Sequence, residues 1–510
     1  MSSGPAGVAN RGLITASIML ATIMNSLDTT IANVALPHMA GSVSASADQI
    51  TWVLTSYIVA AAIMTPLTGW LAGRLGRKKV FMVSIIGFTV ASALCGAAQT
   101  LGQIVGFRLL QGLFGAALIP LSQAVLMDIN PPEQQGPAMA MWGMAAILGP
   151  IVGPALGGWL TEDFSWRWVF YINLPLGALA FAGVYSFVHD HKHEERIPFD
   201  FLGFILLSAA IGSFQLFLDR GDDRAWFEST EIWIEASVAV VALGLFAFHT
   251  ATADRPFLPR AMLRDINFVT ATAFGFFIGI LLFSTLALLP PMMETLMGYP
   301  VVTTGLVTAP RGVGSLISMF LVGQLIRRAD ARLIILAGLI ISAGALYGMT
   351  RFSLQMDASL FIWTGLLQGI GIGLIFVPLT TLAFATINPS LRADGAGVFT
   401  LVRNLGSSAG ISIMQALHTS NSQILHSTLV EHLRPDNPMA RAPWLAAPFS
   451  LTNPAGVALL NGEVDRQASM IAYIDDFHLM LFVALALAPA LLLMRRPPRS
   501  GAPNEPMLAD

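Results

Sequence analysis

The stretch that decides the fold is MNSLDTTIANVALP, Met24 to Pro37, which puts a carboxylate in the middle of an apolar run. The run extends from Leu13 to Pro37 and is long enough to cross a bilayer as a helix. A lone acid at that depth is costly unless it faces a bundle interior or a wet cavity, and such acids are usually functional. Asp28 is therefore the first candidate site residue.

Helical spacing gives Asp28 polar neighbours. Asn25, Thr29 and Asn33 recur every four residues. Asp28 follows Asn25 by three residues, so all four are expected on one broad helix face. A carboxyl group on such a face is suited to take up and release a proton, which is our first interpretation. The alternative is a packing hydrogen bond or a partner for one arginine.

Composition indicates an all-α polytopic membrane protein. Of the 510 residues, 55% are hydrophobic and only 11% are charged, whereas a soluble protein carries roughly 25% charged residues. The single cysteine, Cys95, excludes an intrachain disulfide and a cysteine metal site. The sequence contains no phosphate-binding glycine loop and no catalytic constellation. We therefore expect no enzymatic activity, no cofactor beyond a proton gradient, and no nucleic-acid partner.

Fourteen segments are long and apolar enough to be predicted spans. Short connections join most of them, but a long polar segment, 419–475, is expected to be an external loop. The predicted spans are 13–36, 50–72, 80–98, 103–127, 137–160, 167–188, 200–218, 231–250, 267–292, 303–325, 332–350, 357–385, 395–418 and 476–494.

Lysine and arginine placement predicts the orientation, because cytoplasmic loops carry the excess of these residues. Of the 27 lysines and arginines, seventeen fall in segments on the side of the N-terminus, seven on the other side and three within spans. Both termini are therefore expected in the cytoplasm, and 419–475 in the periplasm.

Four further stretches stand out. A glycine-rich and basic loop, GWLAGRLGRKKVF, runs from Gly69 to Phe81. The fourth span contains FRLLQGLFGAALIP, Phe107 to Pro120, and the fifth contains LGPIVGPALGG, Leu148 to Gly158. In the second half, LVRNLGSSAG runs from Leu401 to Gly410. The Gly69-Trp-Leu71 turn is echoed by Gly323-Gln-Leu325, which suggests two related halves.

With these motifs the chain resembles the major facilitator superfamily, and within it the fourteen-helix drug:proton antiporters of the EmrB and QacA kind. LDTTIANVALP resembles that group's first-helix pattern, with Asp28 on the acidic position. The resemblance implies two six-helix bundles with alternating access. We expect these bundles at 1–190 and 266–510, with an inserted pair of helices in 191–265.

The span-four motif resembles the superfamily's proton-coupling signature, with Arg108 and Gln111 on key positions. Asp28 lies about 12 Å and Arg108 about 7–8 Å from the periplasmic ends of their spans, at a rise of roughly 1.5 Å per residue. We therefore predict that they pair when the carboxylate is charged, and that protonation frees the helices to rearrange. The alternative is a static structural salt bridge.

Two motifs suggest conformational roles. The basic loop resembles the superfamily's cytoplasmic signature, but Gly73 stands where the family has an acid that helps latch the two halves; a positive-inside loop without a gating role is the alternative. The fifth-span motif is similar to the signature that marks exporters, and its glycines allow another helix to approach closely. The predicted gating residues are Gly69, Arg74, Gly76, Arg77, Gly149, Pro150, Gly153, Pro154 and Gly157.

Charged residues of the second half complete the predicted site. Glu294 and Arg311 are expected to pair near the periplasmic mouth, so that Glu294 stabilises the arginine; the alternative is that Glu294 biases the cavity towards cations. Arg403 is expected to use Asp394 or helix carbonyls. No metal site is predicted: His189, His191 and His193 alternate in a loop without an acidic or cysteine ligand. The predicted substrate cavity contains Asn25, Thr29, Asn33, Gln111, Glu294, Arg311 and Arg403.

The predicted function is proton-coupled export of hydrophobic or amphipathic drugs across the bacterial inner membrane. The alternative on the same fold is an exporter of one metabolite, such as a siderophore, a fatty acid or an amino-acid derivative. A different class, a membrane receptor or scaffold, predicts no effect of Asp28→Asn on transport. Expected partners are the bilayer, a small hydrophobic substrate, and a periplasmic adaptor with an outer-membrane channel.

Overall fold

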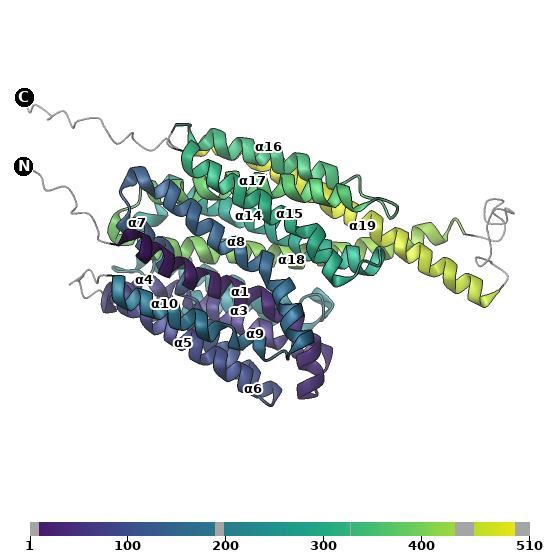
Figure 1. Cartoon of the computed structure of the whole chain (residues 1–510), viewed down its shortest axis with the longest axis horizontal. Coiled ribbons are helices and arrows are strands. Elements are labelled where there is room, and N and C mark those ends of the chain that lie inside the picture. Colours follow the sequence, from purple (N-terminus) through teal and green to yellow (C-terminus); the bar gives the residue numbers. More distant parts are fainter. Residues whose placement is uncertain (1–9, 189–197, 327, 434–452, 495–510) are drawn as a thin grey trace, which may run out of the picture.

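The computed structural model describes residues 10–188, 198–326, 328–433 and 453–494, and within these ranges it is helical, with no strand. Labelled as in Figure 1, the helices are α1 (Arg11–Val43), α2 (Ala47–Ile50), α3 (Trp52–Met64), α4 (Leu67–Leu75), α5 (Arg77–Ala97), α6 (Leu101–Gly115), α7 (Leu118–Ile129), α8 (Pro132–Asp163), α9 (Trp168–Tyr171), α10 (Asn173–Phe187), α11 (Phe201–Arg220), α12 (Thr230–Thr252), α13 (Arg260–Leu263), α14 (Ile266–Pro291), α15 (Val301–Leu325), α16 (Ala331–Met349), α17 (Ala358–Ala385), α18 (Arg392–Val430) and α19 (Pro454–Ala490).

Most predicted spans correspond to helices that meet the requirements for crossing a membrane. Among the described residues, 12 helical segments are long and apolar enough, and the bent pair α3 and α4 would bring the number to 13. The two members of that pair meet at 56°, where Pro66 supplies no backbone donor. The thirteenth predicted span lies in α18, which has ample length but a more polar sequence than the others.

The helices form two bundles with a pair of helices beside them. In the first bundle α1 packs on α8 and α10, and α6 packs on α3 and α5; in the second, α17 lies against α15 and α16, and α18 against α14 and α19. α11 and α12 pack on each other, and α11 contacts α3 and α18. Figure 1 shows the purple and blue helices in one half of the molecule and the green and yellow helices in the other. The division at residues 190 and 266 stays a prediction.

The two bundles meet at one end and diverge at the other. α1 begins and α19 ends at the end that we call the termini side, and the bundles spread apart toward the opposite end, the arm side (Figure 1). On the termini side, Arg392 of α18 lies 3.6 Å from Asp128 of α7. At Gly69 of α4 a β-carbon would overlap the side chain of Asp394. The space between the bundles is therefore closed on the termini side.

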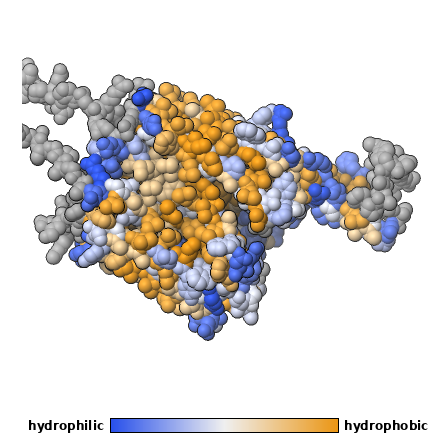
Figure 2. Space-filling view, viewed as in Figure 1, coloured by the Kyte–Doolittle hydropathy of each residue, from blue (hydrophilic) through white to orange (hydrophobic). Residues whose placement is uncertain are grey.

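The prediction of a loop at 419–475 is wrong for most of its length. α18 continues to Val430 and α19 begins at Pro454, and both extend past the other helices as a helical arm (His418–Val430 and Pro454–Asp476; Figure 1). Ser422 and Ser469 lie 3.1 Å apart through their Oγ atoms. The arm is largely hydrophilic, whereas the body is largely hydrophobic (Figure 2). Polarity excludes a segment from the hydrocarbon but does not exclude a helix, which is why the prediction failed.

Candidate functional site

The predicted pair of Asp28 and Arg108 is in contact at the centre of the first bundle. Arg108 Nη1 lies 2.7 Å from Asp28 Oδ2, and the side chains are 1% and 0% exposed. Asp28 Oδ1 accepts two more hydrogen bonds, each 2.8 Å long, from Gln111 Nε2 and Asn173 Nδ2. Every one of these contacts is a donation to the carboxylate, so the site accommodates Asp28 in its charged form.

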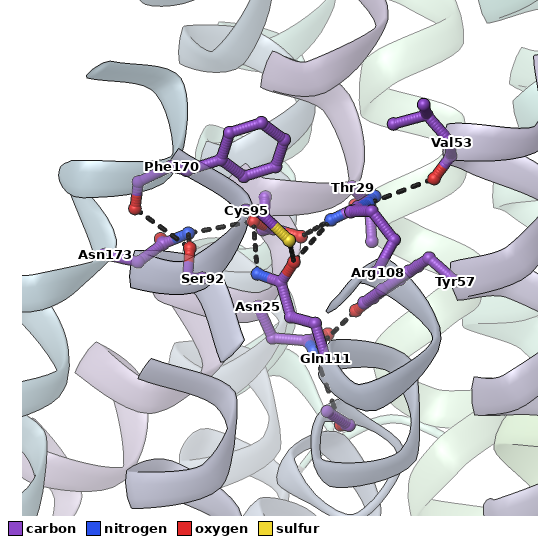
Figure 3. Close-up of polar contacts among 12 residues, drawn as sticks. Asn25, Thr29, Val53, Tyr57, Ser92, Cys95, Arg108, Gln111, Phe170 and Asn173 are labelled. Atoms are coloured by element: carbon purple, nitrogen blue, oxygen red, sulfur yellow. Dashed lines mark hydrogen bonds and ion pairs between the residues drawn. The ribbon is translucent and has the colours of Figure 1, made fainter. Parts of the chain in front are cut away.

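Neighbouring groups hold the donors in place, as Figure 3 shows. Arg108 Nε donates to the carbonyl of Val53 at 3.1 Å, and its guanidinium carbon lies 4.3 Å from the ring centroid of Tyr57. Asn173 Nδ2 also donates to Ser92 Oγ at 3.0 Å. Arg108 and Gln111 face the same side because they are three residues apart on α6. A pocket supported from α1, α3, α5, α6 and α10 is well suited to sense the charge of one carboxyl group.

The predicted polar face of α1 divides into two parts. Asn25 is buried and donates from Nδ2 to Tyr57 Oη at 3.1 Å and to the Gly115 carbonyl at 3.3 Å. Thr29 and Asn33 are exposed. Asn25 therefore joins the packed interior around Asp28, whereas the other two are accessible to a ligand or to water.

Asn173, Tyr57 and Ser92 belong to this site but were missed by the sequence-based analysis. Asn173 had a signal, because it is a lone amide in the apolar stretch YINLPLG, and it begins α10 close to Asp28. Tyr57 and Ser92 carry no pattern that separates them from ordinary span residues. Their role depends on the packing of helices that are distant in sequence.

Among the described residues, the expected ion pair of Glu294 with Arg311 is absent, and Arg403 does not use Asp394, one of its two suggested kinds of partner. Arg311 is 6% exposed and donates from Nη2 to the Leu282 carbonyl at 2.8 Å, so the pairing with Glu294 was wrong. Arg403 bonds to the side chain of Asn404 and lies over the ring of Phe376. Its suggested partner Asp394 lies instead at Gly69 on the termini side. A guanidinium can satisfy its donors with carbonyls and amides, which helical spacing alone does not reveal.

The predicted gating loop lies where the bundles meet. Gly76 has φ 90°, a conformation that favours glycine, and it separates α4 from α5. Arg77 forms an ion pair with Asp128. Arg74 is exposed and lies 5.2 Å from the ring centroid of Trp70. The loop thus makes a charged contact on the termini side; its gating role stays a prediction.

The glycines of α8 lie against α1. A β-carbon at Gly149 would overlap the main chain of Ser26, and one at Gly157 would come within 2.8 Å of Ile31 Cγ1. A β-carbon at Gly153 would overlap Thr30 Oγ1, so all three predicted glycines permit a close approach. α8 continues unbroken through Pro150 and Pro154. Their part in conformational change stays a prediction.

No group of three or more metal-ligating side chains occurs in the described part of the chain. The histidines considered at the sequence level, His189, His191 and His193, lie outside the described residues.

Comparison with known proteins places this chain in a class of transporters. Residues 18–411 match the family model of the Major Facilitator Superfamily, so the chain belongs to this superfamily of transporters, which are not enzymes. Among solved structures, the human organic anion transporter MFSD10 (TETRAN) has a TM-score of 0.60 at 15% identity, over 93% of this chain and 99% of that chain. The proton:xylose symporter XylE has a TM-score of 0.59 at 14% identity, over 95% and 97%. At these identities they show the fold alone.

Curated relatives define the membership more narrowly. The fatty acid resistance protein FarB of Neisseria gonorrhoeae is 34% identical over 96% of this chain and 97% of its own length. The multidrug export protein EmrB of Escherichia coli K12 is 34% identical over 95% of both chains. The chain is therefore a multi-pass membrane protein of the EmrB/FarB-like efflux family.

Proposed function

We propose that this protein exports hydrophobic or amphipathic small molecules across the inner membrane in exchange for protons. The observation that carries the proposal is the fully buried ion pair of Asp28 and Arg108, 2.7 Å apart. Charged groups inside membrane proteins mark ion and proton pathways. Protonation of Asp28 removes the charge that holds Arg108, Gln111 and Asn173 together, so α1, α6 and α10 gain freedom to move relative to one another.

The arrangement of the bundles supports the transport cycle. We place both termini in the cytoplasm, as the lysine and arginine distribution indicates. The contact between Asp128 and Arg392 then closes the cytoplasmic side, and the diverging bundles open toward the periplasm (Figure 1). In this state Asp28 takes up a proton after substrate is released outward. The helical arm would lie in the periplasm, which favours the proposed adaptor and outer-membrane channel as partners.

The test is transport by the purified full chain in proteoliposomes with an acidic lumen. Anionic, neutral and cationic hydrophobic fluorescent probes are offered in parallel. We expect accumulation that depends on the pH gradient for wild type, none for Asp28→Asn, and a normal rate for Asp163→Asn, which removes an exposed carboxylate at the end of α8. Gradient-driven transport by Asp28→Asn would show that coupling resides elsewhere, and no transport by wild type would contradict export.

The second candidate is export of one metabolite class, and the similarity to FarB favours fatty acids among the alternatives. The same proteoliposomes separate the two candidates. A broad exporter accumulates chemically unrelated probes, whereas a metabolite exporter accumulates only one kind.

A further inference from the structure

The arginines within the spans are not equally neutralised. Arg108 has Asp28 at 2.7 Å, but neither Arg311 nor Arg403 has a carboxylate within ion-pair distance among the described residues. A guanidinium buried in a low-dielectric interior is costly without a counter-charge. The second bundle therefore carries two guanidinium groups, a buried one at Arg311 and a half-buried one at Arg403, that have no carboxylate partner in the described part of the protein.

Arg311 finds a hydrogen-bond acceptor within its own bundle. It is 6% exposed, and its Nη2 donates to the carbonyl of Leu282 on α14. Main-chain carbonyls at this depth are partners that a buried arginine commonly uses. Its contacts are those of a residue that holds α14 and α15 together.

Arg403 is different, because it lies where the two bundles meet. Its guanidinium carbon is 5.6 Å from the ring centroid of Phe376 on α17. That ring stacks on Trp142 of α8, with the centroids 5.8 Å apart and the planes 14° from parallel. Trp142 belongs to the first bundle, so this aromatic contact bridges the bundles and places Arg403 at their interface.

The donors around this contact are not all used. Arg403 Nη2 has one partner, Asn404 Oδ1 at 3.3 Å, and Arg403 Nε is buried without a partner. The indole Nε1 of Trp142, a residue that is 0% exposed, is also buried without one. Both groups can only donate. The unused Nε donor of Arg403, on a guanidinium without a counter-charge, favours an acceptor, and most of all a negatively charged one.

The face of α18 next to Arg403 is accessible. Ser407 and Gly410 of α18 pack on α14, and Ser408 and Ser412 bond to α11. Asn404 is exposed, and helical spacing places it between these two covered faces, on the side that turns toward α4 and α7 of the first bundle. A ligand between the bundles can therefore reach Arg403.

We propose that Arg403, with Asn404, binds the acidic headgroup of an anionic amphipathic substrate, such as a long-chain carboxylate. This rests on the export function proposed above and names its substrate class. The ring of Phe376, stacked on Trp142, packs against the guanidinium and holds it at the interface of the two bundles. Arg403 then selects for charge, whereas Asp28 couples transport to protons.

The test measures binding to the full chain in phosphatidylcholine nanodiscs. The probes are dodecanoate, dodecanol and dodecyltrimethylammonium, which share a chain length and differ in headgroup charge. We expect dodecanoate to bind about tenfold more tightly than the other two probes, because this is the usual contribution of one charge-assisted hydrogen bond to affinity. Equal affinity of the wild-type protein for all three probes would overturn the proposal while leaving the export function intact. This comparison requires no variant.

Variants locate the site. Arg403→Gln is expected to lose the roughly tenfold preference, and Arg403→Lys to keep most of it. Arg224→Gln removes a guanidinium that is 52% exposed and serves as the matched control. Unchanged preference in Arg403→Gln contradicts the assignment. Displacement of dodecanoate by phosphatidylglycerol in the nanodisc would assign the site to a lipid instead.

Discussion

Single glycines determine how closely the helices around Asp28 approach. At Gly149 the main chain of Ser26, two residues before Asp28, occupies the position of a β-carbon. Thr30 Oγ1 donates to the carbonyl of Gly149 at 3.1 Å, so the same contact also carries a hydrogen bond. The α1–α8 contact thereby fixes the depth and rotation of the carboxylate.

We predict that Gly149→Ala destabilises the protein by about 1–3 kcal/mol, because main-chain atoms cannot move aside as a side chain can. Gly158→Ala is the matched control, since a β-carbon there meets only Val34 Cγ1 at 3.9 Å. Alanine also favours a helix over glycine by roughly 1 kcal/mol, so this control should be neutral or slightly stabilising. Thermal unfolding in detergent measures both. Equal melting temperatures for the two variants would contradict the close contact.

At the residue scale, the sequence predicted one contact between helices and missed others. The depth of Asp28 and Arg108 was enough to predict their pairing, which the structure confirms. The same reasoning did not predict the partners of Arg311 and Arg403. These partners are a carbonyl and an amide, and such groups are present on every helix, so they leave no signal in the sequence. Asn173 was visible only as one polar residue in an apolar segment.

Among the elements, the helical arm departs most from expectation. His418 Nδ1 lies 3.5 Å from Asp476 Oδ2 at its base, and His426 Nε2 lies 3.0 Å from Asn461 Oδ1 further out. These polar contacts join two antiparallel helices that have little apolar surface to bury. The 3.6-residue pattern of a two-helix arm with polar contacts is weak, and the residues themselves resemble those of a loop.

We predict that Ser422→Cys with Ser469→Cys forms a disulfide on mild oxidation, because the Oγ atoms are 3.1 Å apart. The natural cysteine, Cys95, is buried, so it should not compete for disulfide formation or alkylation. Ser427→Cys with Ser469→Cys is the control, as Ser427 is displaced along and around α18. Mass spectrometry after alkylation reports the bond. A free loop at 419–475 would give similar, low yields for both pairs.

For the whole molecule, the termini side is where the bundles are held together. Gly73 replaces the acid expected in the basic loop, and nothing approaches a β-carbon there. Two other acids occupy the region: Asp128, between Arg77 and Arg392, and Asp394, packed on Gly69. Burial raises the pKa of Asp394 from 3.8 to about 6, and the nearby Arg77 partly opposes this. A contact between the bundles is thus present without the family's acid.

This burial predicts a pH dependence of closure. When the bundles separate, Asp394 becomes exposed and its pKa returns toward the ordinary value, so the closed state binds the proton more tightly. Lowering the pH from 7 through about 6 toward 4 therefore favours the closed state. Over this range the equilibrium constant between closed and open states is expected to rise roughly tenfold or more. Asp394→Asn is expected to be more closed at pH 7 and to lose the dependence.

Spin labels at Leu75 and Leu333, which are 52% and 62% exposed, report the separation of the bundles by pulsed resonance. Asp254→Asn, at an exposed site after α12, is the control and should keep the wild-type pH profile. A pH-independent distance in the wild type, or an unchanged profile in Asp394→Asn, would show that Asp394 does not control closure.

The overall architecture was the most predictable level, because span length and charge placement are properties of the sequence alone. The all-helical major facilitator fold is confirmed by the family match and by the solved structures of the same shape. The relative position of the bundles was not predictable, since it depends on contacts between helices that are distant in sequence.

The continuity of the arm with two spans of the second bundle makes it a lever. From Pro454 to Asp475, α19 extends about 33 Å at the helical rise of roughly 1.5 Å per residue, with no break before it enters the body. A tilt of the second bundle therefore displaces the far end of the arm more than its base. In the proposed transport cycle, such a tilt would become a mechanical movement at the far end of the arm, where the proposed periplasmic adaptor would detect whether the protein is loaded or empty.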